Sequence, residues 1–195
     1  NYEQALTSKS EEEKSALLNI VIVGGGPTGV ELAGAIAEMK DKILPKDYPE
    51  LNFGQMNIYL VEAAPRLLNG MSEASGIKVE QYLSDLGIHV KAGISVKNYN
   101  GHAASLSNDN TLYTRCLIWA AGVKGAALNG LPVASVLPNK RILVDEFNRI
   151  EGLQNVFAVG DISLMKTGVY QKGHPQVAPV AMQQAGLLTK NLLKA

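Results

Sequence analysis

One segment determines the architecture of this chain: Asn19-Ile20-Val21-Ile22-Val23-Gly24-Gly25-Gly26-Pro27-Thr28-Gly29. A β-branched run leads directly into a G-x-G-x-x-G turn, which is typical of the first strand and helix of a dinucleotide-binding βαβ unit. Gly24 permits the tight turn, and Gly26 lets backbone N–H groups approach a pyrophosphate. The residues expected to hold that pyrophosphate are Gly24, Gly26, Pro27, Thr28 and Gly29.

The residues after this turn predict a helix over about 27–43. Gly29, Ala33 and Ala37 recur at i, i+4 and i+8, so they form a face of small side chains that can lie close against a sheet. The positive N-terminal end of such a helix would point at the phosphates, so no lysine is needed there. A tight strand-to-helix turn without a ligand is the alternative interpretation.

An acidic residue follows the next apolar run. Residues 56–61 predict the second parallel strand, and Glu62 comes directly after it. A carboxylate at this position can accept hydrogen bonds from both hydroxyls of an adenosine ribose and would repel a 2′-phosphate. NADH is therefore favoured over NADPH, although Arg66 could host that phosphate. Glu62 lies further past the glycines than the usual roughly 20 residues, because residues 42–55 form an extra segment, here called the excursion, between the predicted helix and the second strand.

Composition excludes several classes of function. The 195 residues are 46% hydrophobic and 18% charged, which is ordinary for a globular protein. Lys plus Arg equals Asp plus Glu at 18 each, so no net field attracts nucleic acid, which is not expected as a partner. The three histidines show no metal-ligand spacing, and no metal is expected. They are His89, His102 and His174.

Two features bear on compartment and completeness. Cys116 is the only cysteine, which excludes an internal disulfide framework and fits a reducing compartment. No uncharged run is long enough for a transmembrane helix. The chain begins with Asn1 rather than methionine, and we expect it to be an internal piece of a longer polypeptide.

The remaining patterns suggest three segments. We expect a leading helix or linker over 1–18, a dinucleotide-binding domain over 19–122, and the incomplete closing part of a second domain over 123–195. Within 19–122 the patterns predict a helix over 73–86, a third strand over 88–90, an antiparallel meander over 94–116, and a further strand in the parallel sheet over 117–122. Within 123–195 they predict a loop over 124–140, strands over 141–145 and 155–159, and a helix over 180–193. The predicted fold class is α/β, with a Rossmann-like βαβ domain and a β-meander.

Four motifs together resemble a known family. They are Val23–Gly34 (VGGGPTGVELAG), Val61–Leu68 (VEAAPRLL), Trp119–Val123 (WAAGV) and Phe157–Asp161 (FAVGD). In order and spacing they are similar to the flavoproteins with two dinucleotide-binding domains, and most similar to type II, non-proton-pumping NADH dehydrogenase. The resemblance implies that 19–122 is the NADH domain and that 123–195 closes the FAD domain.

The resemblance also implies roles for individual residues. Ala121 and Gly122 would line the nicotinamide side, and Glu31 would lie near the nicotinamide and flavin rings. Gly160 and Asp161 would contact the ribityl chain of FAD. Gln183 and Gln184 would lie on the quinone side, although Pro179 stands where many members carry Gln. From the residues alone, Glu31 could equally complement the helix dipole, Asp161 could be a turn residue, and the two glutamines could be surface helix formers.

The implied parent is an FAD-dependent NADH:quinone oxidoreductase of the respiratory chain. A hydride would pass from NADH to FAD, and two electrons would then reach a membrane quinone. We expect a cytoplasmic parent attached peripherally to the membrane through segments outside this chain, a fragment that is inactive alone, and a homodimer as one candidate assembly. Two alternatives stay open: an isolated NADH-binding module without flavin, and a related disulfide or sulfide oxidoreductase whose redox cysteines lie outside this chain.

Overall fold

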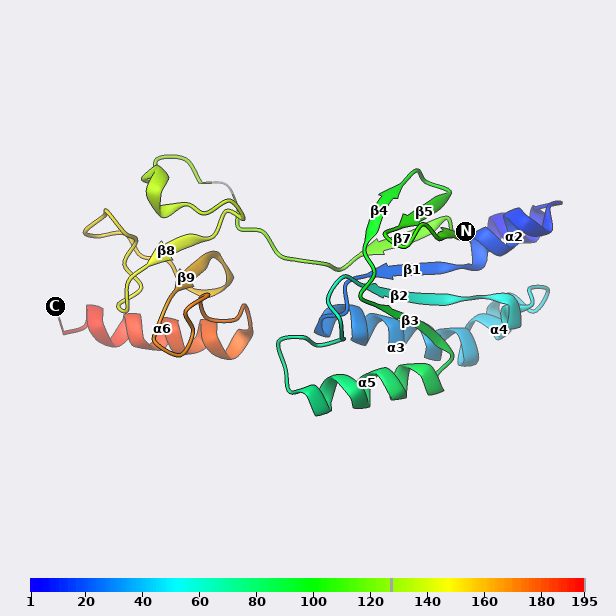
Figure 1. Ribbon diagram of the computed structural model, residues 1–195, viewed down its shortest axis with the longest axis horizontal. Helices are drawn as coiled ribbons and strands as arrows, with labels where there is room; N and C mark the ends of the chain where they lie inside the picture. Colours follow the sequence, from blue (N-terminus) through cyan, green and yellow to red (C-terminus); the bar gives the residue numbers. More distant parts are fainter. Residues whose placement is uncertain (127, 195) are drawn as a thin grey trace. The chain divides into compact units, whose positions relative to one another are not determined.

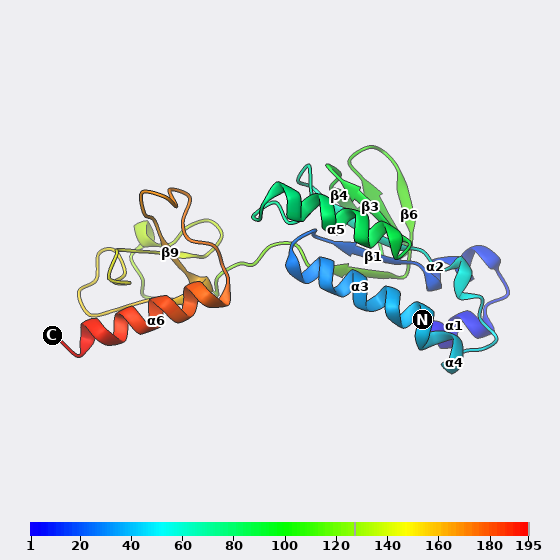
Figure 2. The ribbon, with the colours of Figure 1, turned by 90° about the horizontal axis from the view of Figure 1, so that it is seen from below.

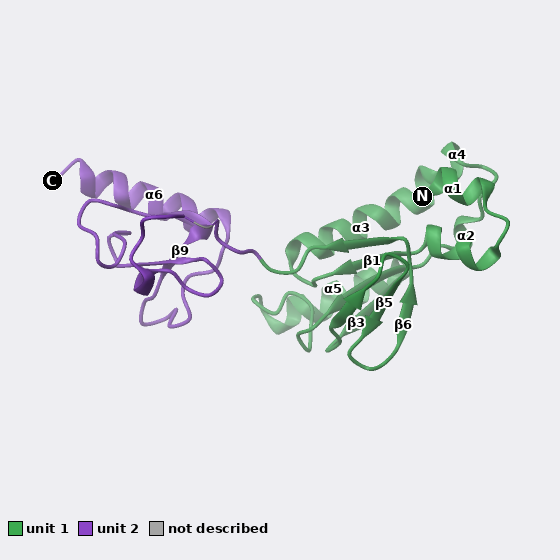
Figure 3. Ribbon diagram, turned by 90° about the horizontal axis from the view of Figure 1, so that it is seen from above, with its two compact units in different colours: residues 1–122 green, residues 123–195 purple. Residues whose placement is uncertain are grey.

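The computed structural model describes residues 1–126 and 128–194. Ala127, which falls in the loop expected over 124–140, and Ala195 lie outside the described residues. The chain forms two compact units, 1–122 and 123–195 (Figure 3).

Unit 1 is built on a central parallel sheet. Its strands are β1 (Ile20–Val23), β2 (Ile58–Glu62), β3 (Ile88–Ala92) and β7 (Cys116–Trp119), in the order β3-β2-β1-β7. Ile20 lies opposite Ile58 in β2 on one side and opposite Cys116 in β7 on the other. The helices are α1 (Tyr2–Thr7), α2 (Glu11–Leu18), α3 (Pro27–Lys42), α4 (Leu44–Asp47) and α5 (Glu73–Asp85), with a short 3-10 turn η1 (Phe53–Gln55). The predicted α/β, Rossmann-like fold class is confirmed.

The two faces of the sheet are covered by different elements. Helices α3 and α5 cover one face and lie side by side (Figures 1 and 2), where Ile22 and Leu60 pack against Ala33. The meander covers the other face, where Val21 and Leu106 share a second buried cluster. All four residues of β1 are therefore buried, as expected of a strand with both faces covered.

The small-residue face of α3 forms as predicted, and α5 begins with a side-chain cap. Gly29, Ala33 and Ala37 are all buried on α3. The side chain of Ser72 accepts a hydrogen bond from the Ser75 N–H at the start of α5, which satisfies one of the free amides of the first turn.

The meander consists of β4 (Val96–Tyr99), β5 (Ala103–Leu106) and β6 (Thr111–Tyr113), paired antiparallel. This arrangement was predicted from the turn residues between the short apolar runs. The meander takes the place of a crossover helix between β3 and β7, so β7 returns beside β1.

The leading segment over 1–18 contains helices α1 and α2 and packs into unit 1. Leu18 is fully buried, and the Tyr2 ring packs edge-on against Phe53 with 5.7 Å between centroids. Phe53 belongs to the excursion over 42–55, so that excursion and the first two helices bury one another's apolar side chains.

Unit 2 contains the two-stranded parallel sheet β8 (Ile142–Val144) and β9 (Ser163–Met165), two 3-10 turns η2 (Val133–Ser135) and η3 (Gly160–Ile162), and helix α6 (Ala178–Leu192). The strand predicted over 155–159 is wrong, because this apolar run makes a single bridge within the described residues, between Phe157 and Arg149. The partner of β8 is instead β9. Three residues directly after a turn give too short a pattern to be recognised as a strand.

Candidate nucleotide-binding site

The glycine turn ends with an open helix N-terminus. Gly26 is the N-cap of α3, Pro27 is its first residue, and no side chain caps it. The N–H groups of Thr28 and Gly29 therefore have no acceptor within the helix. A Cβ on Gly26 would have no atom within 4 Å, so there is open space beside Gly26 at this end of the helix. Backbone donors, a positive helix end and free space together fit a pyrophosphate.

Gly24 and Gly29 are required by the backbone itself. Gly24 has φ +116°, and a Cβ there would come within 2.8 Å of backbone atoms of Ala120 and Ala121. A Cβ on Gly29 would lie 1.8 Å from the Gly24 carbonyl oxygen. These two glycines let β1, α3 and the end of β7 approach one another closely.

The Glu62 carboxylate lies beside this turn and is held by two backbone amides. One oxygen accepts a hydrogen bond from the Gly25 N–H at 2.5 Å, and the other accepts one from the Ala64 N–H at 2.6 Å. A carboxylate has about four acceptor positions, so one on each oxygen stays available. The half-buried side chain is thus fixed in place with two acceptors left for a ribose diol.

Gly25 is a position that sequence reasoning missed. A Cβ there would lie 2.9 Å from the Glu62 Cβ and 2.5 Å from a methyl carbon of Leu67. Its carbonyl accepts a hydrogen bond from the Leu68 N–H at 2.8 Å. Gly25 therefore connects the phosphate end of the site to the ribose end, and the unbroken Gly24-Gly25-Gly26 triplet was the available signal.

Arg66, which sequence reasoning kept as a candidate host for a 2′-phosphate, is engaged elsewhere. Its guanidinium donates to four backbone carbonyls that follow it in the chain, at 3.0–3.4 Å. They belong to Leu68, Asn69, Met71 and Ser72. Arg66 closes this loop beside Glu62, so both terminal nitrogens of its guanidinium are already engaged.

The end of β7 borders the glycine turn. The Ala120 N–H donates to the Val23 carbonyl at 2.8 Å, and the Trp119 Nε1–H donates to the Ala121 carbonyl at 2.8 Å. Gly122 follows with φ +74°. Unit 1 thus brings Ala121 next to Gly24, at the carboxyl edge of the sheet where α/β folds bind nucleotides.

Glu31 is exposed on α3. It is the fifth residue of the helix and lies beyond the first turn, which contains no acidic residue. Interaction with the helix dipole fades beyond the first turn, so the structure does not favour a helix-dipole role for Glu31. A role of Glu31 near the nicotinamide stays a prediction.

Unit 2 brings together Gly160, Asp161 and Gln184. Gly160 has φ +75° and begins η3, while Asp161 is exposed. The Gln184 side chain is buried, and its Oε1 accepts a hydrogen bond from the Gly160 N–H at 2.8 Å. Gln183 is exposed on the same helix. The description of both glutamines as surface helix formers is therefore wrong for Gln184.

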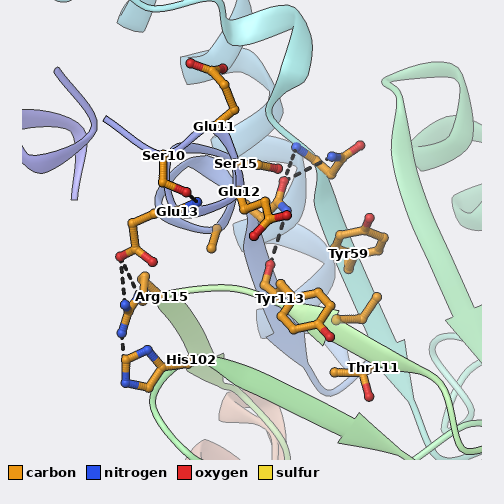
Figure 4. Close-up of a pocket in the computed structure, with 14 residues that line it drawn as sticks. Ser10, Glu11, Glu12, Glu13, Ser15, Tyr59, His102, Thr111, Tyr113 and Arg115 are labelled. Atoms are coloured by element: carbon orange, nitrogen blue, oxygen red, sulfur yellow. Dashed lines mark hydrogen bonds and ion pairs between the residues drawn. The ribbon is translucent and has the colours of Figure 1, made fainter. Parts of the chain in front are cut away.

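A separate hollow of about 880 Å³ lies at the opposite, amino edge of the sheet (Figure 4). Its lining includes Asn19 and Asn57, just before β1 and β2, and Arg115, just before β7. Arg115 is paired with Glu13 at 2.7 Å, and neighbouring carboxylates such as Glu12 also line the space. Its volume suits a ligand, but these acidic side chains would repel the phosphates of a dinucleotide.

Cys116 lies half-buried on β7. Burial raises the pKa of its thiol, so the unreactive thiol form predominates at neutral pH. Cys116 also packs against the main core cluster of unit 1, which is typical of a structural strand residue.

A family model described as pyridine nucleotide-disulphide oxidoreductase matches residues 1–185. The chain belongs to this family. A probable mitochondrial NADH-ubiquinone oxidoreductase of Schizosaccharomyces pombe is 31% identical over 94% of this chain and 34% of its own length. The type II NADH:quinone oxidoreductase Ndh of Mycobacterium tuberculosis is 29% identical over 94% of the chain and 40% of its length.

A solved structure agrees with these relatives. NDH2 from Plasmodium falciparum in complex with NADH superposes with a TM-score of 0.73 and 26% identity, over 84% of this chain and 36% of that one. The family member described here therefore spans between a third and two-fifths of the length of these relatives.

Proposed function

We propose that this chain is the NADH-binding portion of a flavin-dependent type II NADH:quinone oxidoreductase. The observation that carries the proposal is the Glu62 carboxylate, fixed by the Gly25 and Ala64 amides beside the open N-terminus of α3. The similarity to the NADH-ubiquinone and NADH:quinone oxidoreductases of S. pombe and M. tuberculosis supports this proposal.

In this proposal each residue of unit 1 has one task. The N–H groups of Thr28 and Gly29 bind the pyrophosphate, and Gly26 leaves room for it. Glu62 accepts the two hydroxyls of the adenosine ribose. Ala121 and Gly122 border the nicotinamide, whose carboxamide Glu31 orients from α3.

Unit 2 supplies the flavin side. Gly160 has a positive φ, and the Asp161 carboxylate beside it is exposed. An exposed carboxylate can accept hydrogen bonds from a ribityl chain, so the residues present fit FAD. When bound, FAD would supply the redox chemistry that moves two electrons from NADH to a quinone. Gln183, exposed on α6, faces the quinone.

We also propose that the parent works at a membrane surface, because quinones partition into lipid. Among the described residues, no helix combines the length and apolar character needed to cross a bilayer. We propose a peripheral attachment through segments outside this chain, as the family resemblance implies.

The decisive experiment is calorimetric titration of the purified chain with NADH, followed by flavin analysis of the full-length parent. We expect NADH binding by the chain and bound FAD in the parent. A chain that binds NADH beside a parent that purifies colourless would favour the isolated nucleotide-binding module. No NADH binding by the parent would refute the proposal.

A further inference from the structure

The two adjacent glutamines of α6 occupy different environments. Gln184 is 7% exposed, whereas Gln183 is exposed. Consecutive helical residues point about 100° apart, so the two side chains differ in exposure although both line one small hollow of about 190 Å³. The family resemblance grouped them on the quinone side, and the structure gives them different hydrogen-bond environments.

Gln184 is tied to the turn that carries Asp161. Its Oε1 accepts from the Gly160 N–H at 2.8 Å and lies 3.1 Å from the Ser163 hydroxyl. That hydroxyl in turn lies 2.9 Å from the Gly160 carbonyl oxygen. One side-chain oxygen of α6 therefore contacts the first residue of η3 and the residue that follows it, on either side of Asp161.

Other contacts hold the same region. The buried Asn148 amide donates to the Gln184 carbonyl at 3.4 Å, and the Gln176 amide donates to the Asp161 carbonyl at 3.0 Å. A Cβ on Gly160 would lie 3.5 Å from the Ala181 Cβ, in ordinary contact with α6. The backbone of Asp161 is thus fixed while its side chain stays exposed.

We infer that Gln184 is a positioning residue for the flavin-binding turn and does not contact the quinone. This rests on the proposed function. Rotating the Gln184 amide toward a quinone would leave the Gly160 N–H without its acceptor, and an unpaired buried donor is unfavourable. The Gln183 side chain makes no hydrogen bond among those described, so we assign the quinone contact to Gln183.

The test uses the full-length parent with Gln184→Met, which keeps the side-chain length and removes the acceptor. We expect FAD affinity to fall by roughly tenfold to a hundredfold, the effect of losing one buried hydrogen-bond partner. Gln184→Glu retains an acceptor for Gly160 and should restore FAD binding. If Gln184→Met does not fold, Gln184→Asn keeps the amide but withdraws it from the turn, and it should show the same FAD loss.

The matched control is Gln183→Met, which should retain FAD and raise the KM for quinone. The inference is overturned if Gln184→Met keeps FAD at the affinity of the unmodified parent, or if it keeps FAD and raises the quinone KM. Asp161→Ala separates this outcome from failure of the proposed function. If Asp161→Ala also retains FAD, the flavin assignment itself fails; if it loses FAD while Gln184→Met does not, only the role of Gln184 fails.

Discussion

Replacing Glu62 with Gln tests the ribose site with the smallest change in shape. In the native chain each carboxylate oxygen accepts one backbone N–H, from Gly25 or from Ala64. Glutamine offers one oxygen and one NH₂ group, so one of these two amides would face another donor. The side chain must then rotate or lose one hydrogen bond, and one acceptor for the ribose is lost with it.

The expected magnitude follows from the charge of the lost partner. A hydrogen bond to a charged group contributes about 1.5–3 kcal/mol. At about 1.4 kcal/mol for each tenfold change, NADH affinity should fall by roughly 10- to 100-fold. NADPH should lose less, because removing the carboxylate also removes repulsion of the 2′-phosphate, and the preference for NADH should narrow.

The assay is calorimetric titration of the chain with each nucleotide at fixed salt. Glu12→Gln is the matched control, because Glu12 is exposed at the amino edge of the sheet and lines the hollow in Figure 4. It should leave both affinities unchanged. The reasoning is refuted if Glu62→Gln binds NADH within twofold of the unmodified chain, or if Glu12→Gln is the variant that weakens binding.

Three further predictions concern the same unit. Gly26→Ala should weaken NADH binding without lowering the melting temperature, since its Cβ meets open space. Gly29→Ala should lower the melting temperature by several degrees, because its Cβ would meet the Gly24 carbonyl oxygen and overpacking costs about 1–3 kcal/mol. Thermal unfolding and NADH titration of both variants test this, and the same behaviour in the two variants would contradict it. Arg66→Ala should weaken binding of NADH and NADPH by similar factors, because both terminal nitrogens of the Arg66 guanidinium already bind loop carbonyls. A selective loss of NADPH in the titration would show that Arg66 does host the 2′-phosphate. Cys116 should react with iodoacetamide much more slowly in the folded chain than in urea at pH 8, since burial raises the pKa of its thiol; equal alkylation rates would contradict this. For the same reason, the stability of the fold should fall as pH rises above the pKa of the unfolded thiol.

The parts of the fold that could be predicted from the sequence are those set by the backbone. Gly24 and Gly29 are needed because no Cβ fits at those positions, and such a requirement leaves a direct mark in the sequence. The alternation of apolar runs and turn residues likewise predicted the parallel sheet and the meander. Glu62 could be recognised because it ends the second strand.

The remaining features depend on partners that are distant or that carry no side-chain signal. Arg66 binds backbone carbonyls, which every residue possesses, so its role left no pattern. Gln184 points inward because Gly160 and Ser163 lie beneath α6, and helical spacing alone could not show this. The apolar run over 155–159 has strand composition, but a strand also needs a neighbouring edge, and in the part of the chain that the structure describes this run forms one isolated bridge, with Arg149.

The most direct measurement is a crystal structure of this chain grown with NADH. The account predicts the pyrophosphate against the Thr28 and Gly29 amides, with the adenosine ribose on Glu62 at the carboxyl edge of the sheet. Nucleotide density in the hollow beside Arg115 and α2, with the Glu62 carboxylate contacting only Gly25 and Ala64, would contradict it.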